Sequence, residues 1–157
     1  GRSFALKNCD ILVTMFSDIS ALKYQVASIK RKSKIKKKKF EVFTLCHVVC
    51  KKTNKQAQKY YDDYSKNKID KIAVSNFSNI IANNPKNKIL KSIQKKNLQK
   101  MAGGIGSYPI IGSPKKVISE LNKIRNSGID GVVISFLNYK DEIKFFTQKV
   151  LSVINKH

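Results

Sequence analysis

Two kinds of hydrophobic pattern alternate along this chain. Unbroken apolar and β-branched runs have the length of buried β-strands, and they occupy residues 11–16, 40–50, 108–111 and 131–137. Between these runs, apolar residues recur every three or four positions, which is the spacing of one helix face. The pattern therefore predicts four strands, each followed by helical sequence, with a further short helix over residues 3–10.

Individual helices can be assigned a buried face and a cap. Asp18 and Thr53 stand just before two of the helical segments, where a side-chain oxygen can accept a hydrogen bond from an unpaired backbone amide. After the first strand, the predicted buried face consists of Ile19, Leu22, Val26 and Ile29. For the last helix, the predicted buried face consists of Ile143, Phe146, Val150 and Ile154.

The alternation of strand and helix indicates an α/β protein. Strands that alternate with helices are typically parallel and joined by right-handed crossovers, so we expect the strands to pair in sequence order. Two architectures fit four such units. One is a doubly wound sheet, and the other is half of a (β/α)8 TIM barrel, which needs about 250 residues when complete. Periodicity does not choose between them.

Residues 65–102 have the weakest pattern. Apolar positions within this stretch are compatible with two helices, which Asn83, Asn84 and Pro85 would separate. A connection of this length between strands is unusual in a compact α/β domain. We therefore predict that residues 65–102 form a helical lid or insertion.

The strand over residues 40–50 carries a candidate catalytic side chain. Because successive side chains point to opposite faces, we expect His47 to share one face with Phe43, Leu45 and Val49, and the other face to pack on helices. The helical sequence after this strand places His47 near the strand's carboxyl end. Histidine can donate or accept a proton near neutral pH. A core histidine that bonds a backbone carbonyl is the alternative.

Four segments in the same order resemble the bacterial-luciferase-like flavin-dependent monooxygenase family. Thr44–Tyr64 is similar to that family's sixth strand and helix, and Tyr108–Phe136 to its seventh strand, its seventh helix and its eighth strand. Asn138–Leu151 resembles the closing helix, and the opening GRSFALKNCDILVTMF resembles the helix and strand after the flavin-phosphate loop. Leu45 departs from sulfonate-oxidising relatives, some of which have a basic residue there.

The resemblance implies a fold and a chemistry. Residues 1–157 would be a partial barrel domain, the C-terminal half of a (β/α)8 TIM barrel with four parallel βα units. In the complete enzyme, a separate flavin reductase supplies reduced FMN, which uses O2 to oxygenate a small organic substrate. The resemblance further implies a homo-oligomer, and it places His47 near the flavin or the substrate as a catalytic residue.

The first three residues are a candidate cofactor site. Gly1, Arg2 and Ser3 stand where the family has a Ser-x-x-Gly-Arg loop that leads into a helix. Unpaired amides at a helix start favour phosphate, and Arg2 could add a charged contact. The resemblance therefore implies that these residues bind the FMN phosphate, with an ordinary helix cap as the alternative. A start at Gly1 in place of Met also suggests a trimmed or truncated product.

The charge balance raises a second functional class. The chain has 32 Lys and Arg against 10 Asp and Glu, a net charge of +22, which would suit a nucleic-acid partner. However, only Arg2, Arg31 and Arg125 are arginines, and an AT-rich genome favours lysine at tolerant surface positions. Most of the aromatic residues also fall at core positions. A nucleic-acid-binding module is thus disfavoured, and an inactive truncated remnant stays open.

The cysteines and the hydropathy limit which other kinds of protein this chain can be. Cys9, Cys46 and Cys50 are odd in number and form no CxxC pair, which argues against a disulfide framework and a metal site. We expect buried thiols in a reducing cytoplasm. No apolar run reaches the roughly 18 residues of a membrane span, and no signal peptide opens the chain. We therefore expect no membrane partner.

Overall fold

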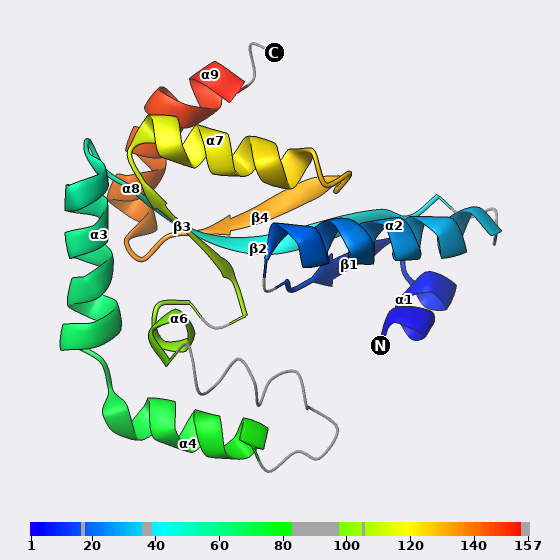
Figure 1. Cartoon of the computed structure of the whole chain (residues 1–157), viewed down its shortest axis with the longest axis horizontal. Helices are drawn as coiled ribbons and strands as arrows, with labels where there is room; N and C mark the ends of the chain where they lie inside the picture. Colours follow the sequence, from blue (N-terminus) through cyan, green and yellow to red (C-terminus); the bar gives the residue numbers. More distant parts are fainter. Residues whose placement is uncertain (17, 36–38, 83–97, 105, 155–157) are drawn as a thin grey trace.

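A parallel β-sheet forms the centre of the computed structural model, with helices around it (Figure 1). The structure describes all residues except 17, 36–38, 83–97, 105 and 155–157. The described strands are β1 (Ile11–Thr14), β2 (Glu41–Cys50), β3 (Tyr108–Gly112) and β4 (Gly131–Ser135). The α/β class and the parallel pairing predicted from the alternating pattern are confirmed.

Helices connect the strands and extend beyond both ends of the sheet. The described α-helices are α1 (Arg2–Asn8), α2 (Ile19–Ile35), α3 (Asn54–Asp62), α4 (Lys71–Ala82), α6 (Leu98–Ala102), α7 (Pro114–Arg125), α8 (Tyr139–Phe146) and α9 (Ser152–Ile154). Two π-helical turns, η1 (Asp63–Asn67) and η2 (Thr147–Leu151), directly continue α3 and α8. None of the described helices is long and apolar enough to cross a membrane.

Strand β2 pairs with all three other strands. Residues 41–44 of β2 pair with β1 and residues 46–50 pair with β3, whereas residues 43–47 pair with β4. Since a strand has two edges, the overlapping registers put β1 and β3 one after the other on one edge and β4 on the opposite edge. The expectation that all four strands pair in sequence order is therefore wrong for β4, which pairs with β2 instead of β3.

The length of β2 explains this arrangement. It has 10 residues, whereas β1 has 4 and β3 has 5, so β1 and β3 together fill a single edge. Three strands thus lie side by side in the order β1, β2, β4, and β3 extends the sheet beside the carboxyl end of β2 (Figure 1).

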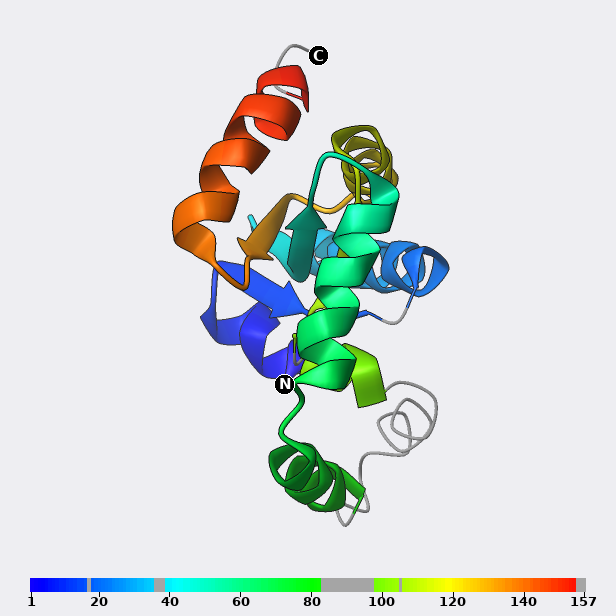
Figure 2. The same cartoon turned by 90° about the vertical axis from the view of Figure 1, so that its left-hand side faces the viewer.

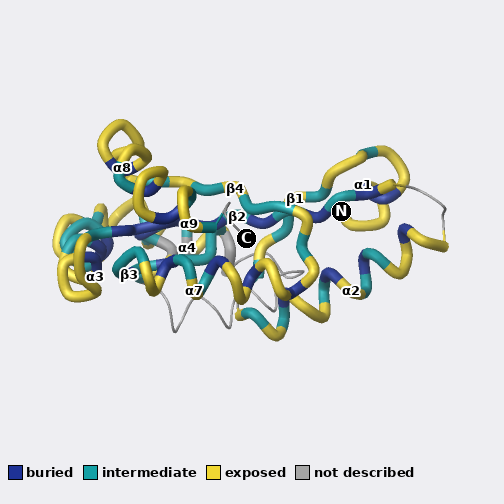
Figure 3. Tube along the Cα trace, turned by 90° about the horizontal axis from the view of Figure 1, so that it is seen from above, coloured by how far each residue is buried: buried dark blue, intermediate teal, exposed yellow. Residues whose placement is uncertain are grey.

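The main core lies between one face of β2 and the helices. Val42, Cys46 and Val48 belong to a single buried cluster, as expected for alternate positions on one strand. Helix α2 contributes Leu22, Val26 and Ile29 to this cluster, α7 contributes Val117, Leu121 and Ile124, and the C-terminal helices contribute Phe146 and Val150. Figure 3 shows the buried trace of β2 between the exposed outer turns of these helices.

The buried cysteines are neutral thiols, as predicted. Cys46 and Cys50 are buried and unpaired. Burial raises the pKa of Cys46 to about 12 and is also the main reason why the pKa of Cys50 rises to about 11. Neither side chain is therefore a thiolate near neutral pH, and both pack as small apolar groups.

Local caps start the helices at the expected residues. The Asp18 carboxylate accepts a hydrogen bond of 2.8 Å from the Ala21 amide, and the Thr53 hydroxyl accepts one of 3.2 Å from the Gln56 amide. Gly128, three residues beyond the end of α7, has a φ of 83°, a conformation that glycine adopts without a steric penalty.

Asp130 fixes the start of β4 against the sheet. Its carboxylate accepts hydrogen bonds of 2.8 Å from the Val42 amide and 2.7 Å from the Lys30 ammonium group, while its own amide donates to the Val42 carbonyl at 2.9 Å. One side chain therefore joins β2, α2 and the beginning of β4, which accounts physically for the Gly-Ile-Asp-Gly sequence there.

The last helix differs from the predicted face at one position. Phe146 and Val150 are buried as predicted, but the Ile143 side chain is 48% exposed and Glu142 is only 6% exposed. Glu142 accepts hydrogen bonds from Lys51 at 2.8 Å and from the Asn138 amide at 3.1 Å. These two hydrogen bonds offset the cost of removing the carboxylate from water. Glu142 is therefore buried at the helix face where Ile143 was predicted.

The other face of the sheet is largely open. Ile11 and Val13 in β1 and Val133 in β4 are between 42% and 48% exposed. Phe43 and Leu45 on β2 are half-buried on the same face. The sheet thus has one face covered by helices. Its other face exposes apolar side chains on β1 and β4 but is covered at the carboxyl end of β2, where Val49 packs with Ala57 and Tyr61 of α3.

Residues 65–102 contain two described α-helices, α4 and α6, after the end of η1. Both views place α4 beyond the end of α3, away from the strands (Figures 1 and 2). The predicted break at Asn83, Asn84 and Pro85 lies outside the described residues. The role of this segment as a lid remains a prediction.

Candidate functional site

His47 lies on the open face of the sheet. Its neighbours in sequence, Cys46 and Val48, point into the helix-covered core, so the alternation of β2 turns His47 the other way. The expected orientation, away from the helices that cover the sheet, therefore holds. The side chain is nevertheless only 5% exposed, because residues from β4, η1 and the turn after α6 surround it.

Both ring nitrogens of His47 have hydroxyl partners. The Nε2 atom lies 2.6 Å from the Tyr64 hydroxyl, and the Nδ1 atom lies 3.1 Å from the Ser135 hydroxyl. With the proton on Nδ1, Tyr64 donates to Nε2 and Nδ1 donates to Ser135; in the other tautomer both directions reverse. Since a hydroxyl can donate or accept a hydrogen bond, both ring nitrogens are hydrogen-bonded in either tautomer.

Different elements bring these partners to His47. Ser135 is the residue directly opposite His47 in the parallel register of β2 and β4. Tyr64 lies in the π-helical turn η1, where the helix widens by one residue per turn. Tyr60 and Tyr61 pack edge-on against the Tyr64 ring at centroid distances of 5.6 and 5.5 Å, so the ring has little freedom to move.

Burial keeps this cluster neutral. Desolvation lowers the pKa of His47 below its ordinary value of 6.5, and the negative charge of Glu142 opposes this only in part. Desolvation also raises the pKa of Tyr64, with neighbouring Tyr61 and Glu142 acting in the same direction. Near neutral pH the site therefore holds a neutral imidazole and a protonated phenol, which can pass a proton between His47, Tyr64 and a bound molecule.

A cavity of about 550 Å³ opens at His47 and Tyr64. Apolar walls predominate, and they include Ile69, Val74, Phe77, Phe136 and Leu137. The backbones of Gly103 and Gly104 form another wall. This volume lies within the range of about 300–1,000 Å³ that is typical of small-molecule sites.

Two charged residues at the cavity have partners. The Lys68 ammonium group pairs with the Asp63 carboxylate at 2.7 Å. The Asp70 carboxylate accepts a hydrogen bond of 2.8 Å from the Ala73 amide at the start of α4. Among the side chains that line the cavity, the uncharged polar ones are those of His47 and Tyr64.

The other predicted site residues lie elsewhere. Gly1 caps α1, Arg2 and Ser3 form its first turn, and all three are exposed. None of them lines the cavity at His47, so this chain does not bring the two predicted sites together. No side chain caps α1 and no acidic residue lies in its first turn, which is compatible with a bound phosphate.

Tyr64, Ser135 and Glu142 were missed as site residues by sequence reasoning. Tyr64 is recognisable only as one of several aromatic residues in a helical segment, since the π-helical turn that aims it at His47 has no evident sequence signal. Ser135 becomes a partner through the β2–β4 register, which local pattern does not specify. Within the described residues, no group of three or more His, Cys, Asp or Glu could hold a metal.

Comparison with known proteins shows likeness at the level of structure. No protein-family model and no curated protein matches the sequence. Solved structures match over 99% of this chain: a riboflavin lyase with modified FMN and riboflavin (TM-score 0.80, 13% identity) and a long-chain alkane monooxygenase (0.75, 20%). An EDTA monooxygenase from Chelativorans sp. BNC1 also matches over 99% of the chain (0.78, 16%).

The chain spans only part of each of these proteins. It covers 40% of the riboflavin lyase, 38% of the alkane monooxygenase and 41% of the EDTA monooxygenase. The resemblance to luciferase-like monooxygenases and the partial (β/α)8 barrel inferred from the sequence motifs are confirmed at the level of the fold.

The neutral state of His47 predicts how stability depends on pH. Because the folded-state pKa is lowered, the unfolded chain binds a proton more readily, so stability is greatest above the unfolded-state value of about 6.5. We expect the free energy of unfolding, measured by urea denaturation, to fall as the pH drops through the folded-state pKa. A His47→Gln variant should lose less between pH 7 and 5. His157→Gln is the control, and equal losses in wild type and His47→Gln would contradict the prediction.

Proposed function

We propose that this chain forms part of a flavin-dependent monooxygenase that uses FMN and O2 to oxygenate a small organic substrate. The observation that carries the proposal is the neutral His47–Tyr64 pair, which opens into a largely apolar cavity of about 550 Å³ at the carboxyl end of β2. Active sites of (β/α)8 barrels lie at that end of the strands. The alkane and EDTA monooxygenases that share the fold support the same reaction class.

The cavity residues have distinct roles in this proposal. Phe77, Phe136 and Leu137 exclude water and contact apolar parts of the substrate. His47 holds or moves a proton at Nε2, and the Tyr64 hydroxyl relays it. Flavin, when bound, supplies the reaction with O2, while the protein provides position and a dry environment. The segment 65–102 acts as a lid, since α4 and the turn after α6 border the cavity.

The flavin phosphate would bind at the first turn of α1. Its amides have no side-chain cap, and Arg2 is exposed beside them. Oxyanions are stabilised by such amides and by a guanidinium group. Reduced FMN would come from a separate flavin reductase, and the complete protein would be a cytoplasmic homo-oligomer.

A second candidate is an inactive remnant of such an enzyme. One observation favours it: the apolar side chains of Val13 and Val133 on the open face are 48% and 42% exposed. In a closed barrel, further strands would cover this face. The two candidates differ in whether this chain supports oxygenation.

Isotope transfer from O2 tests the proposed reaction. We expect the protein, mixed with reduced FMN and 18O2, to transfer one labelled oxygen atom to a substrate among linear alkanes, ketones and thioethers, as measured by mass spectrometry. His47→Ala should reduce product formation by about 100-fold or more if His47 is the proton-transfer group. Tyr24→Phe, at a side chain that is 79% exposed, is the control. Absence of labelled product would favour the remnant.

Arg2 tests the phosphate site separately. In a protein that contains the complete barrel, Arg2→Ala should weaken FMN binding by about tenfold, the loss that corresponds to about 1.4 kcal/mol. Riboflavin, which lacks the phosphate, should bind equally to both proteins. Calorimetric titration measures both affinities, and an unchanged FMN affinity in Arg2→Ala would refute this role.

A further inference from the structure

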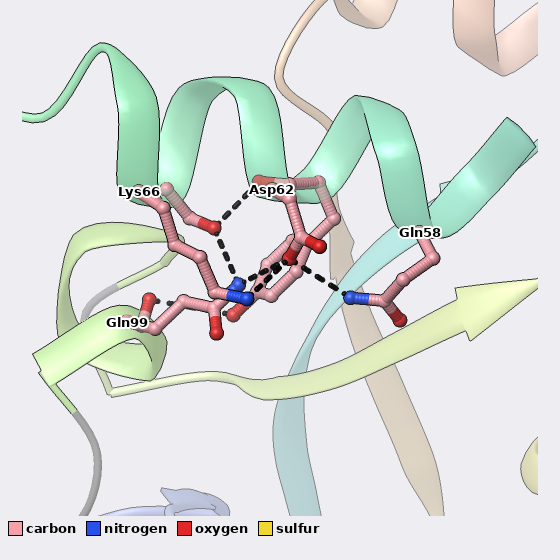
Figure 4. A network of polar contacts seen from close by, with 6 residues as sticks. Gln58, Asp62, Lys66 and Gln99 are labelled. Atoms are coloured by element: carbon pink, nitrogen blue, oxygen red, sulfur yellow. Dashed lines mark hydrogen bonds and ion pairs between the residues drawn. The ribbon is translucent and has the colours of Figure 1, made fainter. Parts of the chain in front are cut away.

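Gln99 links helix α6 to the helical segment that carries Tyr64. The Gln99 side-chain nitrogen donates hydrogen bonds of 2.7 Å to the Asp62 carboxylate and 2.9 Å to the Ser65 hydroxyl. The Tyr61 hydroxyl donates to the Gln99 carbonyl at 3.4 Å. Figure 4 shows Gln99 reaching across from α6 to this cluster at the junction of α3 and η1.

The Ser65 contact reaches the turn that positions Tyr64. While it accepts from Gln99, the Ser65 hydroxyl donates to the Tyr61 carbonyl at 2.5 Å, and it is buried. Ser65 directly follows Tyr64 in sequence, and Tyr61 precedes it by one helical turn. The Tyr61 ring packs edge-on against the Tyr64 ring at a centroid distance of 5.5 Å. Gln99 therefore bonds the helical segment whose geometry aims the Tyr64 hydroxyl at His47.

The backbone of Gln99 also bonds the turn directly after α6. Its carbonyl accepts a hydrogen bond of 2.8 Å from the Gly103 amide. A Cβ atom at Gly103 would lie 2.6 Å from the Tyr61 ring, and one at Gly104 would lie 3.1 Å from the Cβ and Cγ atoms of His47. Because neither residue has a side chain, their backbone lies directly on the two rings. The position of α6 thus determines how closely this turn covers His47.

We propose that Gln99 is a positioning residue, which holds α6 and the Gly103–Gly104 turn over the His47–Tyr64 pair and thereby closes one wall of the cavity. It acts through Asp62, Ser65 and the backbone of α6, and it is not itself among the residues that line the cavity. Its importance for turnover rests on the proposed function, whereas its effect on the covering of His47 does not.

A matched control is present in the same cluster. The Gln58 side-chain nitrogen donates to the same carboxylate oxygen of Asp62 at 3.0 Å, but Gln58 belongs to α3 and does not reach α6 (Figure 4). Gln58→Ala removes one hydrogen bond from Asp62 and leaves α6 attached. Gln99→Ala removes both side-chain hydrogen bonds from α6 to Asp62 and Ser65 and keeps the Tyr61 bond to the backbone carbonyl. Gln99→Glu keeps the shape, loses the donor and places a second carboxylate beside Asp62, so it should act in the same direction as Gln99→Ala.

The first readout is amide hydrogen exchange, measured by NMR on the 157-residue chain. We expect exchange at Gly103 to be about tenfold faster in Gln99→Ala and Gln99→Glu, corresponding to about 1.4 kcal/mol, and unchanged in Gln58→Ala. The Val48 amide in β2 reports global opening and should be unaffected. Equal acceleration at Gly103 and Val48, or no acceleration at Gly103, would overturn the proposal.

The second readout is the titration of the His47 ring. Burial is the main cause of its lowered pKa, so loosening the turn should move the pKa upward toward 6.5 in both Gln99 variants and leave it unchanged in Gln58→Ala. An unchanged pKa in the Gln99 variants would also overturn the proposal. Neither readout involves flavin, so failure of the proposed oxygenation would leave both results interpretable.

Discussion

The length of strand β2 is the constraint on which the rest of the structure depends. With 10 residues it offers two edges long enough for three partners, so β1 and β3 share one edge and β4 takes the other. Its side chains also divide the molecule into two sides. Val42, Cys46 and Val48 join the helix-covered core, and the same alternation turns His47 toward the opposite face.

The local features of the fold could be predicted from the sequence because they depend on neighbouring residues. The amphipathic face of α2, the cap at Asp18 and the orientation of His47 follow from spacing alone, and the structure contains each of them. The pairing of β4 with β2 could not be predicted in this way, because it depends on strand length and on which edge remains vacant. Likewise, Glu142 replaces Ile143 in the interior because of partners that are distant in sequence, Lys51 above all.

The candidate site combines burial with complete hydrogen bonding. His47 loses contact with water but gains Tyr64 and Ser135, so desolvation makes the ring neutral without leaving either nitrogen unpaired. Close by, Glu142 and Lys51 form a partly buried ion pair 2.8 Å apart, and the Lys51 ammonium group lies 3.8 Å from the Tyr60 ring centroid. This second cluster anchors the start of α8 to the end of β2 and limits the electrostatic effect of the Glu142 carboxylate on the site.

If the open face of the sheet at His47 binds the flavin or its substrate, NMR of the histidine side chains detects this binding most directly. The chain has two histidines, His47 and the last residue, His157, so each ring gives one resolvable Hε1 signal, and His157 serves as an internal control. Titration with FMN, alone and with an organic substrate, should shift the His47 signal in a saturable manner and leave His157 unchanged. A His47 signal that stays fixed, or shifts only in parallel with His157, would contradict binding at this face.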